Sequence, residues 1–164
     1  MTANRWQQGR HEGGTACIPS AKSPAPRVLL AEDDSDMRSM LAWALRTEGC
    51  EVTECPDGIT VLSLLEENGR GEQTDAYDVL ISDIRMPGLT ALEILELLPD
   101  PADHPPAILI TAFGDEATHE EAIRLGAAAV VDKPFELDML IAKVHELTLA
   151  NTKPNEQTDN DQRE

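Results

Sequence analysis

The sequence predicts an α/β fold in which helices cover both faces of a parallel β-sheet. Five short apolar runs alternate along the chain with segments whose apolar residues recur at spacings of three and four. The runs Val79-Leu80-Ile81 and Ile108-Leu109-Ile110 are continuously apolar, as in strands that are buried on both sides. Connections between such strands are right-handed, so we expect a doubly wound, flavodoxin-like sandwich that binds its ligands beyond the carboxyl ends of the strands.

Each of the five expected strands is followed by an expected helix. The strands cover Arg27 to Ala31, Glu51 to Glu54, Tyr77 to Ser82, Ala107 to Thr111 and Ala128 to Asp132. The helices each carry one apolar face, formed in the first by Met37, Met40, Leu41, Ala44 and Leu45, and in the last by Leu137, Leu140, Ile141 and Val144. We expect Ser35 to cap the first helix, Asp34 to be either a second cap or a metal ligand, and Thr90 to cap the third.

One folded domain accounts for most of the 164 residues. Residues 27–149 have the usual size of a single domain. Residues 1–26 and 150–164 are polar or rich in Pro and Gly, with little periodic hydrophobicity, so we expect a disordered amino-terminal extension and a disordered carboxy-terminal tail. No apolar stretch approaches the roughly 20 residues of a membrane helix, and no signal-peptide core follows Met1, so we expect a cytoplasmic protein.

The charge of the chain excludes some classes of partner. Its formal net charge of -18 opposes binding to nucleic-acid phosphates and anionic membranes, which depends on Lys and Arg. The expected partner is therefore another protein. Cys17, Cys50 and Cys55 form an odd set without metal-ligand spacing, which predicts reduced thiols in a reducing compartment.

Polar residues at the ends of separate strands indicate a functional site. The acidic string Glu32-Asp33-Asp34 closes the first strand, and Asp83, Thr111 and Lys133 end or follow three others. The carboxyl ends of parallel strands share one edge, so these side chains should converge. Two carboxylates about 5 Å apart repel by roughly 3 kcal/mol at an effective dielectric near 20, and a Mg²⁺ ion with oxygen ligands would offset this repulsion. Acids, metal, hydroxyl and ammonium together suit a phosphoryl group, with Asp83 as the acceptor.

Four motifs give the chain a resemblance to a known family. They are VLLAEDDSDMR, VLISDIRMPG, ILITA and LGAAAVVDKPF, in this order and with spacings that suit one domain. They resemble the receiver domains of bacterial two-component response regulators, and the resemblance covers residues from Arg27 to about Thr148. It implies a five-stranded sheet with the strand order 2-1-3-4-5.

The resemblance also implies a role for each acidic residue. Glu32 and Asp33 would form the acidic pair, with Asp33 as the direct ligand of Mg²⁺. Asp83 would accept a phosphoryl group from a histidine kinase or phosphotransfer protein and would also bind the metal. The backbone carbonyl of Arg85 would complete the protein ligands.

Further roles follow from the same resemblance. Thr111 would bind a phosphoryl oxygen, and Lys133 would pair first with Asp83 and then with the phosphoryl group, its approach fixed by a cis bond before Pro134. Val130 departs from the family, because many receivers have an aromatic residue three positions before the lysine. We therefore expect Phe113 to take part in the readout of phosphorylation instead.

The function that the resemblance implies is that of a stand-alone regulator similar to chemotaxis regulators. It would be a signalling protein and not an enzyme, and it would act on a downstream protein effector through phosphorylation-dependent binding. The resemblance leaves open whether the protein forms a homodimer. Two alternatives remain: a phosphohydrolase with an aspartyl nucleophile, and a receiver-like module that binds partners without phosphorylation. Against the first, Arg85 stands where such enzymes have a second acid. Against the second, the site is complete.

Overall fold

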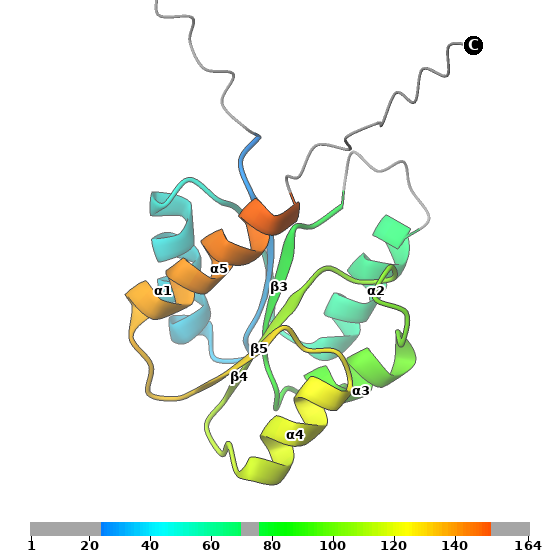
Figure 1. Ribbon diagram of the computed structural model, residues 1–164. Coiled ribbons are helices and arrows are strands. Elements are labelled where there is room, and N and C mark those ends of the chain that lie inside the picture. The colour runs from blue at the N-terminus through cyan, green and yellow to red at the C-terminus, as the bar shows by residue number, and fades with distance from the viewer. Residues whose placement is uncertain (1–23, 70–75, 152–164) are drawn as a thin grey trace, which may run out of the picture.

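Five strands and five helices alternate along the chain in the computed structural model, which describes residues 24–69 and 76–151 (Figure 1). The elements are β1 (Arg27–Ala31), α1 (Ser35–Thr47), β2 (Glu51–Cys55), α2 (Gly58–Gly69), β3 (Val79–Asp83), α3 (Ala91–Leu97), β4 (Ala107–Thr111), α4 (Glu116–Arg124), β5 (Ala129–Asp132) and α5 (Leu137–Asn151). The predicted disordered ends lie almost entirely outside the described residues. Cys17 lies outside them as well.

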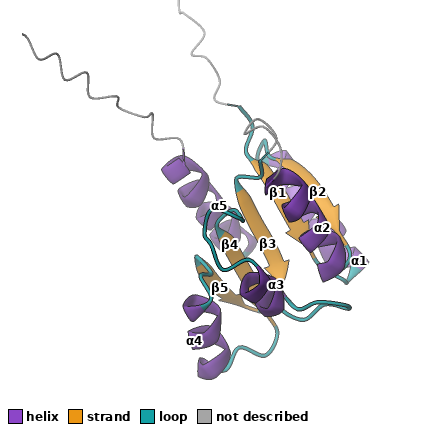
Figure 2. Cartoon of the chain, turned by 90° about the vertical axis from the view of Figure 1, so that its right-hand side faces the viewer, coloured by secondary structure: helices purple, strands orange, loops and turns teal. Residues whose placement is uncertain are grey.

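The strands form one parallel sheet in the predicted order β2-β1-β3-β4-β5 (Figure 2). The bounds of β3 differ from the prediction, which placed this strand at Tyr77 to Ser82. Asp78 instead binds across to the start of β1, where its backbone N–H donates to the Arg27 carbonyl (2.8 Å) and its carboxylate accepts from the Arg27 N–H (2.7 Å). At the other end, Asp83 pairs in register with Ile110 and belongs to the strand.

Helices cover both faces of the sheet, as the continuously apolar strands predicted. Leu29 of β1 belongs to a core formed with α2, α3 and α4, whereas its neighbours Val28 and Leu30 belong to a second core formed with α1 and α5. Figure 1 shows the two groups of helices on opposite sides of the sheet. Side chains alternate between the faces of a strand, so consecutive apolar residues in β3 and β4 fill both cores.

Side-chain caps define where the helices begin. The Asp34 carboxylate accepts from the N–H groups of Asp36 (3.0 Å) and Met37 (2.8 Å), so Asp34 is the cap of α1. The prediction that Ser35 caps this helix was wrong, because Ser35 is already its first helical residue. Thr90 caps α3 as predicted, in a reciprocal capping box with Glu93.

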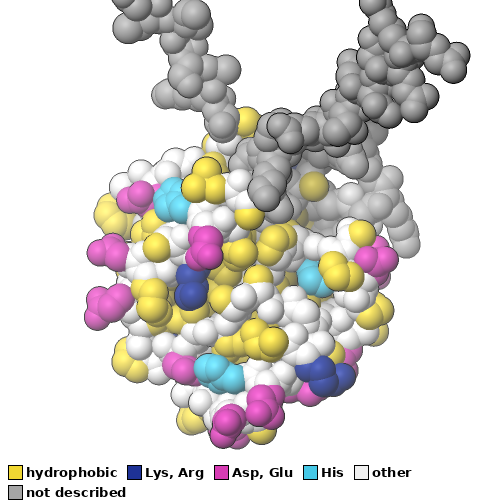
Figure 3. All heavy atoms as spheres, viewed as in Figure 1, with side chains coloured by type: hydrophobic (Ala, Val, Ile, Leu, Met, Phe, Trp, Pro, Cys, Tyr) yellow, Lys and Arg dark blue, Asp and Glu magenta, His cyan; other side chains and the backbone are white. Residues whose placement is uncertain are grey.

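Acidic residues dominate the charged surface of the described chain. On the face shown in Figure 3, acidic side chains are spread widely with few basic ones among them, in keeping with the net charge of -18 of the whole sequence. In the part of the chain that the structure describes, none of the helices combines the length and the apolar character that crossing a bilayer requires.

Candidate functional site

The acidic string after β1 supplies three carboxylates in three different environments. Glu32 is buried; its Oε1 atom accepts from the Asp34 N–H (3.3 Å) and its Oε2 atom accepts from Lys133 Nζ (3.0 Å). Asp33 is exposed, and Asp34 is occupied by capping α1. The string thus presents one buried and one exposed carboxylate to the sheet edge, and its third serves the helix.

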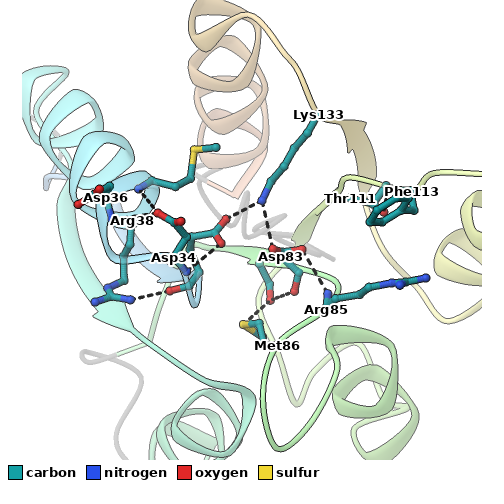
Figure 4. Close-up of polar contacts among 12 residues, drawn as sticks. Asp34, Asp36, Arg38, Asp83, Arg85, Met86, Thr111, Phe113 and Lys133 are labelled. Carbon is teal, nitrogen blue, oxygen red and sulfur yellow. Dashed lines mark hydrogen bonds and ion pairs between the residues drawn. The ribbon is translucent and has the colours of Figure 1, made fainter.

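Asp83 lies at the end of the central strand β3, which places it beside Glu32. Its Oδ2 atom accepts from Lys133 Nζ at 3.1 Å, and its Oδ1 atom accepts from the Arg85 backbone N–H at 3.2 Å (Figure 4). Only 9% of Asp83 is exposed. The structure therefore brings Glu32, Asp83 and Lys133 together as the sequence predicted, with one ammonium between two carboxylates.

Lys133 approaches these carboxylates from the loop that follows β5. Its backbone N–H donates to the Thr111 carbonyl (2.7 Å), and the peptide bond to Pro134 is cis, as expected from the family resemblance. Thr111 is buried at the end of β4, where its hydroxyl oxygen accepts from the Phe113 N–H (3.1 Å). Thr111 is thus tied to the lysine through its carbonyl and to the loop before α4 through its hydroxyl.

Burial and opposite charges act against each other in this cluster. Burial raises the pKa of Glu32 above its ordinary value; the hydrogen bond from Lys133 opposes this shift, and the nearby charge of Asp83 adds to it. Burial alone would lower the pKa of Lys133, but its hydrogen bonds to Glu32 and Asp83 outweigh this effect and raise the pKa. Lys133 is therefore held in its charged form.

Glu32, Asp33 and Asp83 could hold a metal ion together. Each offers one carboxylate oxygen, and these three oxygens lie within 4.8 Å of one another. Hard divalent cations take oxygen ligands, and Mg²⁺ is bound in proteins through one or two carboxylates together with water. The donor set fits Mg²⁺, and all three acids are among the metal ligands that the sequence analysis predicted.

Two loops meet beside this cluster in a contact that the sequence did not reveal. The Arg85 guanidinium lies over the Phe113 ring, 5.1 Å from its centroid, and so connects the loop after β3 with the loop after β4 (Figure 4). A second contact missed from the sequence is the hydrogen bond from the Arg38 guanidinium to the Glu32 carbonyl (2.7 Å). No spacing signals either contact, because the partners belong to separate elements.

Comparison with known proteins decides the family of the chain. The family described as the response regulator receiver domain matches residues 28–145. The chain belongs to the response regulator receiver family. Receiver domains bind Mg²⁺ at an acidic pocket, and they are signalling modules that exchange phosphoryl groups with histidine kinases or phosphotransfer proteins.

Curated relatives of this receiver are longer proteins. It is 30% identical over 132 residues to the alkaline phosphatase synthesis transcriptional regulatory protein SphR of Synechococcus elongatus. The aligned residues cover 79% of this chain and 51% of SphR. It is 33% identical over 117 residues to the transcriptional regulatory protein FixJ of Azorhizobium caulinodans, covering 71% of this chain and 52% of FixJ. The chain thus spans about half the length of these two relatives.

Solved receiver structures match the fold over nearly their whole length. The receiver domain of the Francisella response regulator 1452 aligns with a TM-score of 0.68 and 28% identity, covering 77% of this chain and 98% of that one. The chemotaxis response regulator CheY4 of Vibrio cholerae aligns with a TM-score of 0.63 and 25% identity, covering 75% and 98%. The described fold is therefore that of a receiver domain.

Proposed function

We propose that this receiver accepts a phosphoryl group on Asp83 from a phosphohistidine of a histidine kinase or phosphotransfer protein. The observation that carries the proposal is the position of Asp83, at the end of the central strand with Lys133 3.1 Å from one carboxylate oxygen and two further carboxylates close by. The Asp83 oxygen would form the new bond to phosphorus as the bond from phosphorus to the donor imidazole breaks. Membership of the family supports the same step.

Four residues of this chain would hold Mg²⁺ during the transfer. Asp33 and Asp83 would be direct carboxylate ligands, Glu32 would complete the acidic pair, and the Arg85 backbone carbonyl would add a further oxygen. When bound, Mg²⁺ neutralises negative charge on the carboxylates and on the phosphoryl oxygens. The described donor set, which contains oxygens and neither sulfur nor imidazole, supports Mg²⁺ over Zn²⁺ or Cu²⁺.

Lys133 and Thr111 would bind and report the new charge. A phosphoryl group adds about -1.5 to -2 charges at neutral pH. Lys133, which now contacts two carboxylates, would turn to the phosphoryl oxygens. The bond that the Thr111 hydroxyl accepts from the Phe113 N–H uses an oxygen lone pair, so the hydroxyl can still donate its proton to a phosphoryl oxygen. Movement of Thr111 would shift the Phe113 loop and, through it, α4.

The output of this receiver would be phosphorylation-dependent binding of a protein effector. The net charge of -18 supports a protein partner over direct contact with nucleic acid. SphR and FixJ are named as transcriptional regulators, but each is about twice as long as the segment it shares with this chain. That the receiver acts as a stand-alone regulator stays a prediction. The prediction of a cytoplasmic location is supported by Cys50 and Cys55, which are buried free thiols, as is usual in a reducing compartment.

Incubation with a small phosphodonor and Mg²⁺ tests this function against the two alternatives. We expect one stable acyl phosphate per chain, detected by intact-protein mass spectrometry. Steady release of phosphate with no accumulated acyl phosphate would indicate a phosphohydrolase. No modification by the small donor or by any histidine kinase tried would indicate a module that binds its partners without phosphorylation.

A further inference from the structure

The loop after Asp83 rests against the first turn of α2, and the contact is closest at Gly58. The Gly58 N–H donates to the Pro87 carbonyl at 3.4 Å. A β-carbon on Gly58 would lie 2.0 Å from the Leu89 carbonyl oxygen and 2.8 Å from the Leu89 carbonyl carbon. Atoms in proteins do not approach a β-carbon this closely, so any other residue here must displace backbone and not merely a side chain.

Position 58 requires glycine because of its close approach to the Leu89 carbonyl and not because of its backbone conformation. Gly58 is the first residue of α2, directly after Asp57, whose carboxylate caps the helix by accepting from the Thr60 N–H (2.7 Å). Its backbone does not have the positive φ that Gly49, Gly88 and Gly126 adopt. A helical first turn accepts most residues, so the absent side chain serves the neighbouring loop and not the helix.

The loop cannot easily turn away from a displacement at Leu89. It is closed at its base by the hydrogen bond from the Ala91 N–H to the Ile84 carbonyl (3.0 Å), and the Met86 side chain is buried in the core. Pro87 has a fixed φ. Contacts to a β-carbon shorter than 3.0 Å are essentially never found, so the Leu89 carbonyl oxygen, at 2.0 Å, would have to move by about 1 Å or more. Because Pro87 and Met86 hold the loop, this movement would extend back to Arg85.

We infer that Gly58 is a positioning residue for the metal site, acting through the loop that carries the Arg85 carbonyl. The inference rests on the proposed function, in which that carbonyl is a ligand of Mg²⁺. Mg²⁺ requires near-ideal octahedral geometry, and metal sites tolerate deviations of only about 0.2 Å in ligand distance. The start of α2, which contributes no ligand, therefore sets the affinity of the site.

Calorimetric titration of Mg²⁺ into the unphosphorylated Gly58→Ala variant tests this inference. We expect its dissociation constant for Mg²⁺ to rise about 10-fold, the size of effect that supporting residues have at metal sites. The rate of phosphorylation by a small donor should return to within about two-fold of wild type once Mg²⁺ is saturating. Gly49→Ala is the matched control: its positive φ strains the backbone, but nothing lies near the added β-carbon, and Mg²⁺ affinity should not change.

Each other outcome has a definite meaning. A folded Gly58→Ala variant with wild-type Mg²⁺ affinity would overturn the inference, because Gly88 would then have absorbed the displacement. Wild-type protein that binds no Mg²⁺ would overturn the metal site of the proposed function itself. Should Gly58→Ala not fold, Asp57→Ala can be compared with Asp57→Asn, which retains a capping side chain. Mg²⁺ binding that is weaker in Asp57→Ala than in Asp57→Asn would support the inference. Equal Mg²⁺ affinity of these two variants would overturn it.

Discussion

Replacing Lys133 by alanine leaves the Glu32 and Asp83 carboxylates facing each other with no cation between them. Both carboxylates are largely buried, and one oxygen of Glu32 lies within 4.8 Å of one oxygen of Asp83. At that distance and an effective dielectric near 20, the repulsion is about 3 kcal/mol, comparable to the 3–5 kcal/mol that removal of one partner from a buried pair costs. We expect Lys133→Ala to lower the free energy of unfolding by about 2–3 kcal/mol at pH 7 without Mg²⁺.

The pH dependence of this loss follows from the pKa of Glu32. Burial already raises that pKa with Lys133 present, and removal of the lysine raises it further. A carboxyl group with a higher pKa in the folded than in the unfolded protein destabilises the fold above the folded-state pKa. This effect disappears as the pH falls below the unfolded value. The difference from wild type should therefore shrink between pH 7 and about pH 4, and Mg²⁺ should also reduce it.

Urea denaturation at several pH values, with and without Mg²⁺, measures this effect. Lys143→Ala in α5 is the matched control, because it removes the same charge away from the site and should change stability by less than about 0.5 kcal/mol. An equal loss in the two variants, or a loss in Lys133→Ala that does not change with pH, would refute the electrostatic account.

Three further predictions concern phosphorylation and its readout. Asp33→Ala removes an exposed carboxylate that we propose as a ligand of Mg²⁺, so labelling of Asp83 by a small phosphodonor should fall about 10-fold or more at low Mg²⁺; labelling at the native rate would exclude Asp33 as a ligand. Phe113→Ala should weaken phosphorylation-dependent partner binding more than Val130→Ala does in a binding titration, and the reverse order would count against Phe113 as the readout. Arg85→Asn combined with Phe113→Glu should shorten the lifetime of the acyl phosphate severalfold, because amide and acidic groups can orient an attacking water, whereas neither the Arg85 guanidinium nor the Phe113 ring accepts a proton; an unchanged lifetime would show that these residues do not control the water.

The sequence was sufficient to predict the convergence of Glu32, Asp83 and Lys133. Parallel strands place their carboxyl ends at one edge, so the position of a residue at a strand end determines its place in the fold whatever its distance along the chain. The continuous apolar runs Val79-Leu80-Ile81 in β3 and Ile108-Leu109-Ile110 in β4 likewise predicted a helical layer on each face of the sheet. Features that depend on topology and period were therefore accessible from the residues alone.

Features that depend on the backbone conformation of a single residue or on contacts between loops could not be predicted from the sequence. Ser35 and Asp34 are both good caps, and only the extended backbone of Asp34, with φ of -72° and ψ of 116°, decides between them. The Arg85–Phe113 stack and the contact of Gly58 with the Leu89 carbonyl each join segments from different strand-helix units. Local patterns in the sequence carry no information about such contacts between distant segments, so the sequence alone could not predict them.

The most direct test of the account is to locate the phosphoryl group. The purified protein would be incubated with a small phosphodonor and Mg²⁺, the acyl phosphate trapped by borohydride reduction, and the modified residue identified by peptide mass spectrometry. The account predicts modification at Asp83 alone, dependence on Mg²⁺, and no modification of Asp83→Asn, whose carboxamide is a poor nucleophile of nearly the same shape. Phosphoryl transfer to the Asp83→Asn variant at the native rate, or modification of Asp33 or Glu32 in the wild type, would contradict it.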